Sequence, residues 1–218
     1  MAKAKLVISS KNYSSWSLRG WLLCRMAGLE FDEEIISSDD PSMRAELLVL
    51  SPSTLVPRLI HDGMTIWDTL AIAEYLNEIR PDAGLLPKEQ AARARCRSVS
   101  GEMHSGFNAL RSGMPVNLRK FSPNFSIWSG VRADIDRITT IWRECIALSG
   151  GPFLFGAAPT VADAMFAPVA TRFKTYDVKT DARSTDYCRL ILGMPAMVEW
   201  ITAAARERDE IEELEGEF

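Results

Sequence analysis

The chain has few of the residues that build metal sites and dithiol chemistry. Its 218 residues include two histidines and four cysteines, and no two cysteines form a Cys-x-x-Cys pair. This scarcity excludes a standard zinc site and a dithiol redox motif, so we expect no bound metal. The cysteines are scattered at Cys24, Cys96, Cys145 and Cys188, which is typical of a reducing, cytoplasmic compartment.

Long apolar runs and an excess of positive charge are also missing. No stretch reaches the ~20 apolar residues that a membrane-spanning helix needs. The first five residues lead directly into Leu6-Val7-Ile8 without the apolar core of a signal peptide. The formal net charge of -4 argues against a surface for nucleic acid or anionic lipid. We therefore expect neither nucleic acid nor a membrane among the partners.

The residues that are present predict a globular protein whose first eighty residues alternate between strand and helix. Residues 6–9 form an apolar run that predicts a buried strand, and residues 31–36 predict a second strand. Between them, residues 15–27 carry apolar side chains four positions apart, and Gly28 follows as a helix-ending residue. A weaker pattern indicates a short helix near 42–48.

A proline opens the next strand. Proline has no N–H to donate, so Pro57 must begin a strand or lie at its edge. A cis bond before Pro57 would turn the Val56 backbone groups out of the sheet, where an extended peptide can pair with them. Alternatively, Val56-Pro57 merely starts a strand. Asp62-Gly63 then predicts a hairpin between strands at 57–61 and 65–66.

Asp68-Thr69 opens a helix that ends before Pro81. The first N–H groups of that helix are unpaired and carry partial positive charge, so a ligand carboxylate would bind there, with the Thr69 hydroxyl as a further donor. Asp68 would pair with a ligand ammonium group, or it serves only as a cap. The resulting β-α-β-α-β-β-α order is that of a thioredoxin-like domain.

Beyond residue 81 the pattern is helical. Residues 81–90 contain two prolines and a glycine and predict a linker. Helices are predicted over 89–112, over 130–148 and after Pro195, and the acidic residues 206–218 are expected to fray. Thr160 and Asp163 have capping-box spacing at the start of another helix, so we assign Asp163 a structural role. Pro168 is expected to bend that helix.

Val56-Pro57 and Asp68-Thr69 together resemble the recognition site of the soluble glutathione S-transferase family. In that family the residue before a cis-proline pairs with the cysteinyl backbone of glutathione, and an acidic-then-hydroxyl pair holds the γ-glutamyl end. The resemblance implies a thioredoxin-like glutathione-binding domain at 1–80, a linker at 81–90 and an all-helical domain at 91–218. It further implies glutathione as co-substrate, a small hydrophobic electrophile and a homodimer.

The loop at residues 11–17 would supply the donor to the glutathione thiolate. Its run from Ser14 to Arg19 resembles the Ser-Ser-Cys-Ser-x-Arg stretch of zeta-class enzymes, a serine-type class, whose first serine contacts the thiol. The resemblance makes Ser14 the first candidate, Ser15 the second and Tyr13 the third, although Ser14 or Ser15 also suits a simple helix cap. Trp16 replaces the zeta-class cysteine, which weakens an assignment as maleylacetoacetate isomerase. Residues 51–54 depart from the family's Asn-Pro-x-Gly.

The second substrate is expected in a pocket between the domains. The candidate lining residues are Trp16, His104, Phe107 and Met114, and each of them also suits ordinary core packing. Arg111 would attract an anionic substrate or lie exposed without a specific role. Cys24 lies inside the first predicted helix and is interpreted as a small buried hydrophobe.

The leading hypothesis is therefore conjugation of glutathione to an apolar electrophile. Isomerisation or dehalogenation on the same site is an alternative, as is a binding module of this fold without turnover. A thioredoxin-type oxidoreductase is disfavoured because Cys-x-x-Cys is missing.

Overall fold

A four-stranded sheet forms the first part of the molecule. The computed structural model describes residues 4–37, 40–42, 56–123, 125–208 and 210–215. The strand order is β2-β1-β3-β4, and the bounds are β1 Ala4–Ile8, β2 Phe31–Ile35, β3 Arg58–His61 and β4 Met64–Ile66. β2 runs parallel to β1, whereas β3 pairs antiparallel with both β1 and β4. The Asp62-Gly63 hairpin is thereby confirmed.

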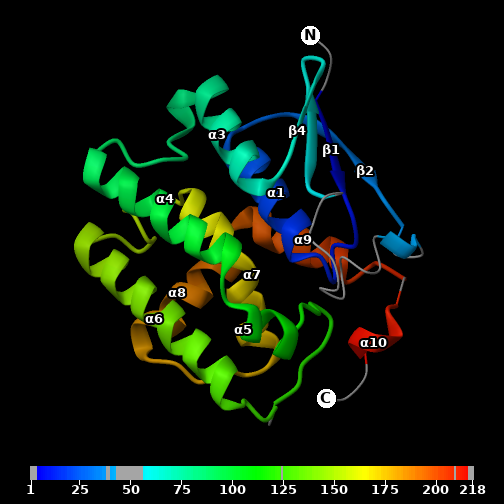
Figure 1. Ribbon diagram of the computed structural model, residues 1–218, viewed down its shortest axis with the longest axis vertical. Coiled ribbons are helices and arrows are strands. Elements are labelled where there is room, and N and C mark those ends of the chain that lie inside the picture. Colours follow the sequence, from blue (N-terminus) through cyan, green and yellow to red (C-terminus); the bar gives the residue numbers. More distant parts are fainter. Residues whose placement is uncertain (1–3, 38–39, 43–55, 124, 209, 216–218) are drawn as a thin grey trace.

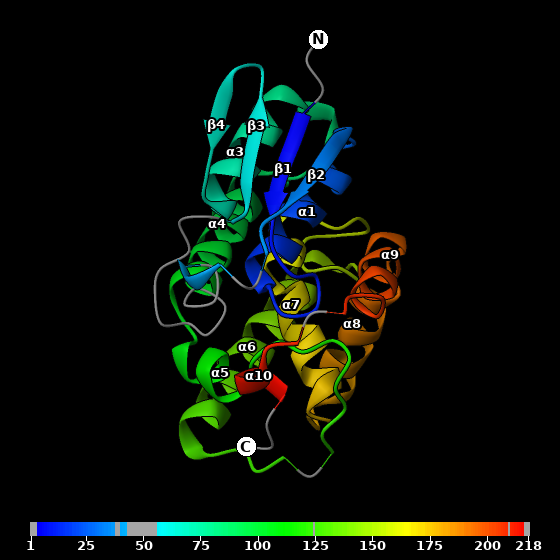
Figure 2. The same ribbon diagram turned by 90° about the vertical axis from the view of Figure 1, so that its right-hand side faces the viewer.

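Two helices cover one face of this sheet, α1 (Ser15–Met26) and α3 (Thr69–Ile79) (Figure 2). β1 is the central buried strand, with Leu6, Val7 and Ile8 fully shielded from solvent. Gly28 adopts a positive φ just after α1, as a helix-ending glycine does. The predicted helix near 42–48 and the 51–54 loop lie almost entirely outside the described residues.

The rest of the described chain is helical and lies mostly below the sheet in Figure 1. The bounds are η1 Pro81–Ala83, α4 Gln90–Ser105, α5 Asn108–Gly113, α6 Ser129–Ser149, α7 Val161–Thr175, α8 Ala182–Leu192, α9 Pro195–Ala204 and α10 Glu212–Glu215. α7 is central, because it packs against α1, α4 and α8 and almost all its residues are buried. These elements confirm a thioredoxin-like part followed by a helical part. No helix among the described residues has the length and apolar character to cross a membrane.

The capping box of α7 is built as its spacing predicts. The Asp163 carboxylate accepts hydrogen bonds from the Thr160 N–H (2.7 Å), the Leu154 N–H (3.1 Å) and the Tyr187 hydroxyl (2.9 Å). Burial raises the pKa of Asp163, and these hydrogen bonds oppose that rise. The carboxylate therefore joins the α7 start to α8 and the preceding loop.

Three sequence predictions about the helical part are wrong or incomplete. The helix predicted over 89–112 divides into α4 and α5, because Gly106 and Phe107 interrupt it and Phe107 takes a left-handed conformation. α8 was not predicted from the pattern. Residues 206–208 and 210–215 do not fray; they return over the sheet end and place α10 in front of the helical layer in the view of Figure 2.

Candidate functional site

Strand register brings the predicted recognition motifs to one end of the sheet. Val7, near the end of β1, pairs with Arg58 at the start of β3. Leu59 pairs with Ile66, the last residue of β4. Three segments therefore lie at the same end of the sheet: the loop after β1, the Val56-Pro57 segment before β3 and the Asp68-Thr69 segment after β4.

Ser14 is the N-cap of α1. Its hydroxyl oxygen accepts a hydrogen bond from the Ser17 N–H (3.1 Å), and its hydroxyl donates to the Ser17 Oγ (2.9 Å). Ser17 Oγ also accepts from the Ser9 N–H (3.0 Å), which ties the helix start to the end of β1. Ser15 is the first residue of α1, and both candidate serines are buried. The predicted capping role of Ser14 is confirmed, while its contact with a thiol stays a prediction.

The Val56–Pro57 peptide bond is cis, as the strand-entry motif suggested. Pro57 lies against α1 where Gly20 allows a close approach, since a Cβ at Gly20 would come within 2.5 Å of the Pro57 Cβ. The Val56 side chain is buried in a small apolar cluster with Val7, Tyr13, Ile211 and Leu214. The Pro57 ring therefore packs directly against the backbone of α1 at Gly20.

Asp68 caps α3 and at the same time contacts the helical part. Its Oδ1 accepts from the Leu70 N–H (2.9 Å), and its Oδ2 lies 3.1 Å from the His104 Nε2 of α4. Thr69 is fully buried, and its hydroxyl has no hydrogen-bond partner within the described parts of the chain. Since buried polar groups are normally paired, this hydroxyl is a donor without an assigned acceptor.

Trp16 and His104 meet, whereas the other predicted pocket residues lie in the core. The centroids of the two rings are 5.0 Å apart at an edge-on angle, and the guanidinium groups of Arg19 (4.7 Å) and Arg111 (4.8 Å) each lie over the Trp16 ring. Burial lowers the pKa of His104, with the nearby Asp68 carboxylate opposing that shift. His104 is therefore neutral near pH 7.

Phe107 and Met114 belong to the hydrophobic core. Arg111 is buried, which corrects the alternative of an exposed residue. Its guanidinium donates to the Gly106 carbonyl (3.0 Å) and other carbonyls at the end of α4, so it caps that helix. Burial lowers the pKa of Arg111 to about 10. Cys24 is confirmed as a buried hydrophobe, since burial raises its pKa to about 12.

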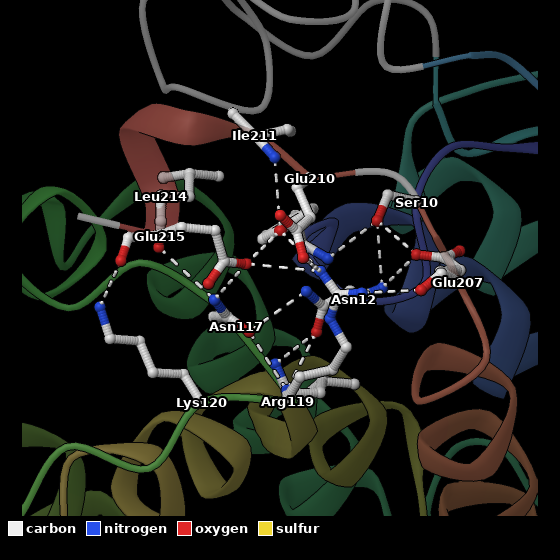
Figure 3. Close-up of polar contacts among 12 residues, drawn as sticks. Ser10, Asn12, Asn117, Arg119, Lys120, Glu207, Glu210, Ile211, Leu214 and Glu215 are labelled. Atoms are coloured by element: carbon white, nitrogen blue, oxygen red, sulfur yellow. Dashed lines mark hydrogen bonds and ion pairs between the residues drawn. The ribbon is translucent and has the colours of Figure 1, made fainter.

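Tyr13 forms hydrogen bonds with polar residues that the sequence did not indicate. Its hydroxyl donates to the Glu215 carboxylate and accepts from the Arg119 guanidinium (3.0 Å). Burial, and next the Glu215 carboxylate, raise the pKa of Tyr13, so the phenol is protonated at neutral pH. Asn12, Asn117 and Arg119 complete this group (Figure 3). No sequence motif marks them, because their partners lie about a hundred positions away.

In the described parts of the chain, no group of three or more His, Cys, Asp or Glu side chains is arranged to hold a metal ion.

Comparisons with known proteins cover both parts of the chain. The family model described as "Glutathione S-transferase, N-terminal domain" matches residues 13–79, and "Glutathione S-transferase, C-terminal domain" matches residues 89–203. The chain is 27% identical over 177 residues to "Probable maleylacetoacetate isomerase" of Caenorhabditis elegans, covering 79% of this chain and 82% of that protein. It is 29% identical over 182 residues to "Maleylacetoacetate isomerase" of Rattus norvegicus, with 80% and 82% covered.

Among solved structures, a glutathione transferase homolog from Burkholderia gl BGR1 with bound glutathione superposes with a TM-score of 0.70. The two chains are 19% identical, and the match covers 93% of this chain and 97% of the other. This likeness shows that the fold is shared.

Proposed function

Because the chain belongs to the glutathione S-transferase family, we propose that it binds glutathione and activates its thiol for attack on a small apolar electrophile. The observation that carries the proposal is the meeting of three motifs at one sheet end: the Ser14 cap, the Val56-Pro57 strand entry and the Asp68-Thr69 helix start. Each motif would contact a different part of glutathione: its charged end, its backbone or its sulfur.

Asp68 and Thr69 would hold the γ-glutamyl end of glutathione. A carboxylate at the start of α3 is stabilised by the unpaired N–H groups there, and the Thr69 hydroxyl is a donor still without a partner within the described residues. Asp68 would face the ammonium group. Val56 would pair with the cysteinyl backbone through its own N–H and carbonyl groups, as strand addition does.

Ser14 would act on the sulfur. The thiolate, not the thiol, is the nucleophile, and the start of α1 favours negative charge. The Ser14 O–H, which donates to Ser17 Oγ in the free protein, would turn to the sulfur while its oxygen still accepts the Ser17 N–H. The thiolate then forms a C–S bond to the electrophile, and the leaving group departs with the bonding electron pair.

A second candidate is glutathione-dependent isomerisation, which the names of the two relatives favour. There the thiolate adds to a cis double bond, the new single bond rotates, and elimination returns glutathione with a trans product. Glutathione-dependent dehalogenation uses the same thiolate. A homodimer, a cytoplasmic location and the division at 1–80, 81–90 and 91–218 are further parts of this proposal.

Calorimetric titration with glutathione tests the proposal. Binding in the micromolar to millimolar range, about -8 to -4 kcal/mol, is expected. Thr69→Ala removes a hydrogen bond to a charged group, worth about 1.5–3 kcal/mol, and should weaken binding tenfold or more. Thr202→Ala, at an exposed position on α9, is the matched control. Rates with 1-chloro-2,4-dinitrobenzene and with a cis-enone diacid then separate conjugation from isomerisation. No binding heat would favour a module without turnover.

A further inference from the structure

The C-terminal segment, defined here as residues 207, 208 and 210–215, contacts the loop that carries Ser14. The Glu207 carboxylate accepts hydrogen bonds from the Lys11 N–H (2.6 Å), the Asn12 N–H (3.0 Å) and the Ser10 hydroxyl (2.7 Å). An acidic side chain of the segment is thus held by backbone donors of the proposed catalytic loop. This contact brings the segment to the sheet end where the glutathione motifs meet.

A second carboxylate of the segment, that of Glu215, is held by side-chain donors. Glu215 accepts from the Tyr13 hydroxyl, from Asn117 Nδ2 (3.0 Å) and from the Arg119 guanidinium (3.4 Å), as Figure 3 shows. Lys120 Nζ donates to the Glu215 backbone carbonyl (3.0 Å). Two neutral donors and one cation therefore converge on one carboxylate oxygen, which is the arrangement that recognises an anion.

The segment also covers an apolar surface beside these donors. Ile211 and Leu214 are buried against Tyr13 and Val56. Val56 is the residue whose backbone we assign to glutathione. The segment therefore presents a carboxylate with an apolar body at the edge of the proposed substrate site.

The backbone at residues 117–119 and the Asn117 amide are held by contacts that do not involve the segment, whereas the Arg119 guanidinium donates both to the Glu207 carbonyl of the segment (2.7 Å) and to the Tyr13 hydroxyl (3.0 Å). Asn12 Nδ2 donates to Asn117 Oδ1 (3.1 Å), and Asn12 Oδ1 accepts from the N–H groups of Leu118 (2.8 Å) and Arg119 (3.1 Å). Both asparagines are buried. These bonds join the proposed catalytic loop to residues 117–119, so the Asn117 amide keeps its place if the segment leaves, and the Arg119 guanidinium keeps the Tyr13 hydroxyl as a partner. By contrast, α10 has four residues and is too short to be stable without its contacts.

We propose that Tyr13, Asn117 and Arg119 form a binding site for a carboxylate with an apolar body, and that Glu215 fills this site in the free protein as an internal competitor. The inference rests on the proposed function for the ligand's identity. The carboxylate belongs either to glutathione itself or to an electrophile that carries one. In both cases the ligand binds only when the segment leaves, so its apparent affinity is scaled by the open fraction.

The test uses the full chain and an unreactive probe, 4-phenylbutyrate, with 4-phenylbutanamide as the neutral counterpart. Glu215→Gln weakens the hold of the segment and should tighten phenylbutyrate binding about three- to tenfold, and Glu207→Ala with Glu215→Ala should tighten it further. Glu212→Gln, at an exposed position on α10, should leave it unchanged. Arg119→Gln in the Glu215→Gln background should reduce phenylbutyrate binding to the level of the amide.

Repeating the titrations with saturating glutathione identifies the source of the carboxylate. Weaker phenylbutyrate binding would assign the site to a glutathione carboxylate, and unchanged binding would assign it to the second substrate. The inference is overturned if Glu215→Gln and the double variant bind phenylbutyrate no more tightly than Glu212→Gln, or if the amide binds equally well. A tightened carboxylate affinity in a protein that shows no heat with glutathione would support the site and refute the proposed function.

Discussion

The two proposed ligand sites of this molecule are assembled in different ways. In the first, Ser14, Val56 and Asp68 each stand where a helix or strand begins, and the pairing of β1, β3 and β4 brings them to one edge. In the second, Tyr13, Asn117 and Glu215 meet without sharing a sheet or helix. Backbone geometry defines the first region, whereas side-chain hydrogen bonds across long sequence separations define the second.

This difference predicts how each region fails. A change in the first region should act on glutathione binding and on the chemistry, because its groups are the ones that we propose contact glutathione. A change in the second should act on access and on carboxylate affinity, because its groups hold the C-terminal segment. Variants that change glutathione binding and carboxylate affinity equally would contradict this difference between the two regions.

The largest effect is expected from Ser14→Ala. Removing one donor to a developing anion costs about 2.7–4 kcal/mol, so kcat/KM for 1-chloro-2,4-dinitrobenzene should fall 10²- to 10³-fold. The pKa of bound glutathione, followed by thiolate absorbance, should rise toward the ordinary thiol value of about 8.5. Ser98→Ala, at an exposed position on α4, is the control. A larger loss of kcat/KM in Ser15→Ala than in Ser14→Ala would identify Ser15 as the donor to the thiolate.

Two helical glycines offer a matched pair for the first region. A Cβ at Gly20 would lie 2.5 and 2.7 Å from the Pro57 ring atoms, whereas no side chain of the described residues lies within 4 Å of a Cβ at Gly101. Gly20→Ala should therefore lower the free energy of unfolding by about 1–3 kcal/mol and weaken glutathione binding through the displaced Pro57. Gly101→Ala should raise it by up to about 1 kcal/mol, since alanine favours a helix. Urea denaturation measures both free energies of unfolding. Equal values for the two variants would mean that α1 and Pro57 move apart without loss of stability.

The sequence predicted the first region because its signals are local. A helix cap such as Asp68 bonds to N–H groups two or three residues ahead, and the Asp62-Gly63 turn joins neighbouring strands. The Thr160–Asp163 box is likewise complete within four residues. Such features need no knowledge of the rest of the chain.

The second region was missed for the opposite reason. The sequence places Glu207 and Glu215 in an acidic stretch that is expected to fray, and no local motif indicates their distant partners. Their partners are the backbone of Lys11 and Asn12 and the side chain of Arg119. The break between α4 and α5 escaped prediction because Phe107, a buried core residue, adopts a left-handed conformation that a phenylalanine seldom takes.

Asn12→Ala tests whether side-chain hydrogen bonds hold the second region together. The substitution removes the hydrogen bonds of the Asn12 side chain to the Leu118 and Arg119 N–H groups and to the Asn117 side chain, each worth about 0.5–1.5 kcal/mol. We expect a matching loss in the free energy of unfolding and weaker phenylbutyrate binding in the Glu215→Gln background. Glutathione affinity should change less. Asn108→Ala, at an exposed position at the start of α5, is the control, and an equal loss there would contradict the role of Asn12.

The smallest effect concerns pH and the contact between α4 and the first region. Burial lowers the pKa of His104 below the ordinary value of 6.5, so the unfolded chain takes up this proton at a higher pH than the native protein does. The contribution of neutral His104 to the free energy of unfolding is fully present above pH 6.5, and it is lost as the pH falls toward the lowered pKa of His104 in the native protein. His104→Gln should make the free energy of unfolding less dependent on pH over that window, measured by urea denaturation at pH 5, 6 and 7.5. An unchanged slope would show that His104 titrates alike in both states, and that its 3.1 Å contact with Asp68 balances the cost of burial.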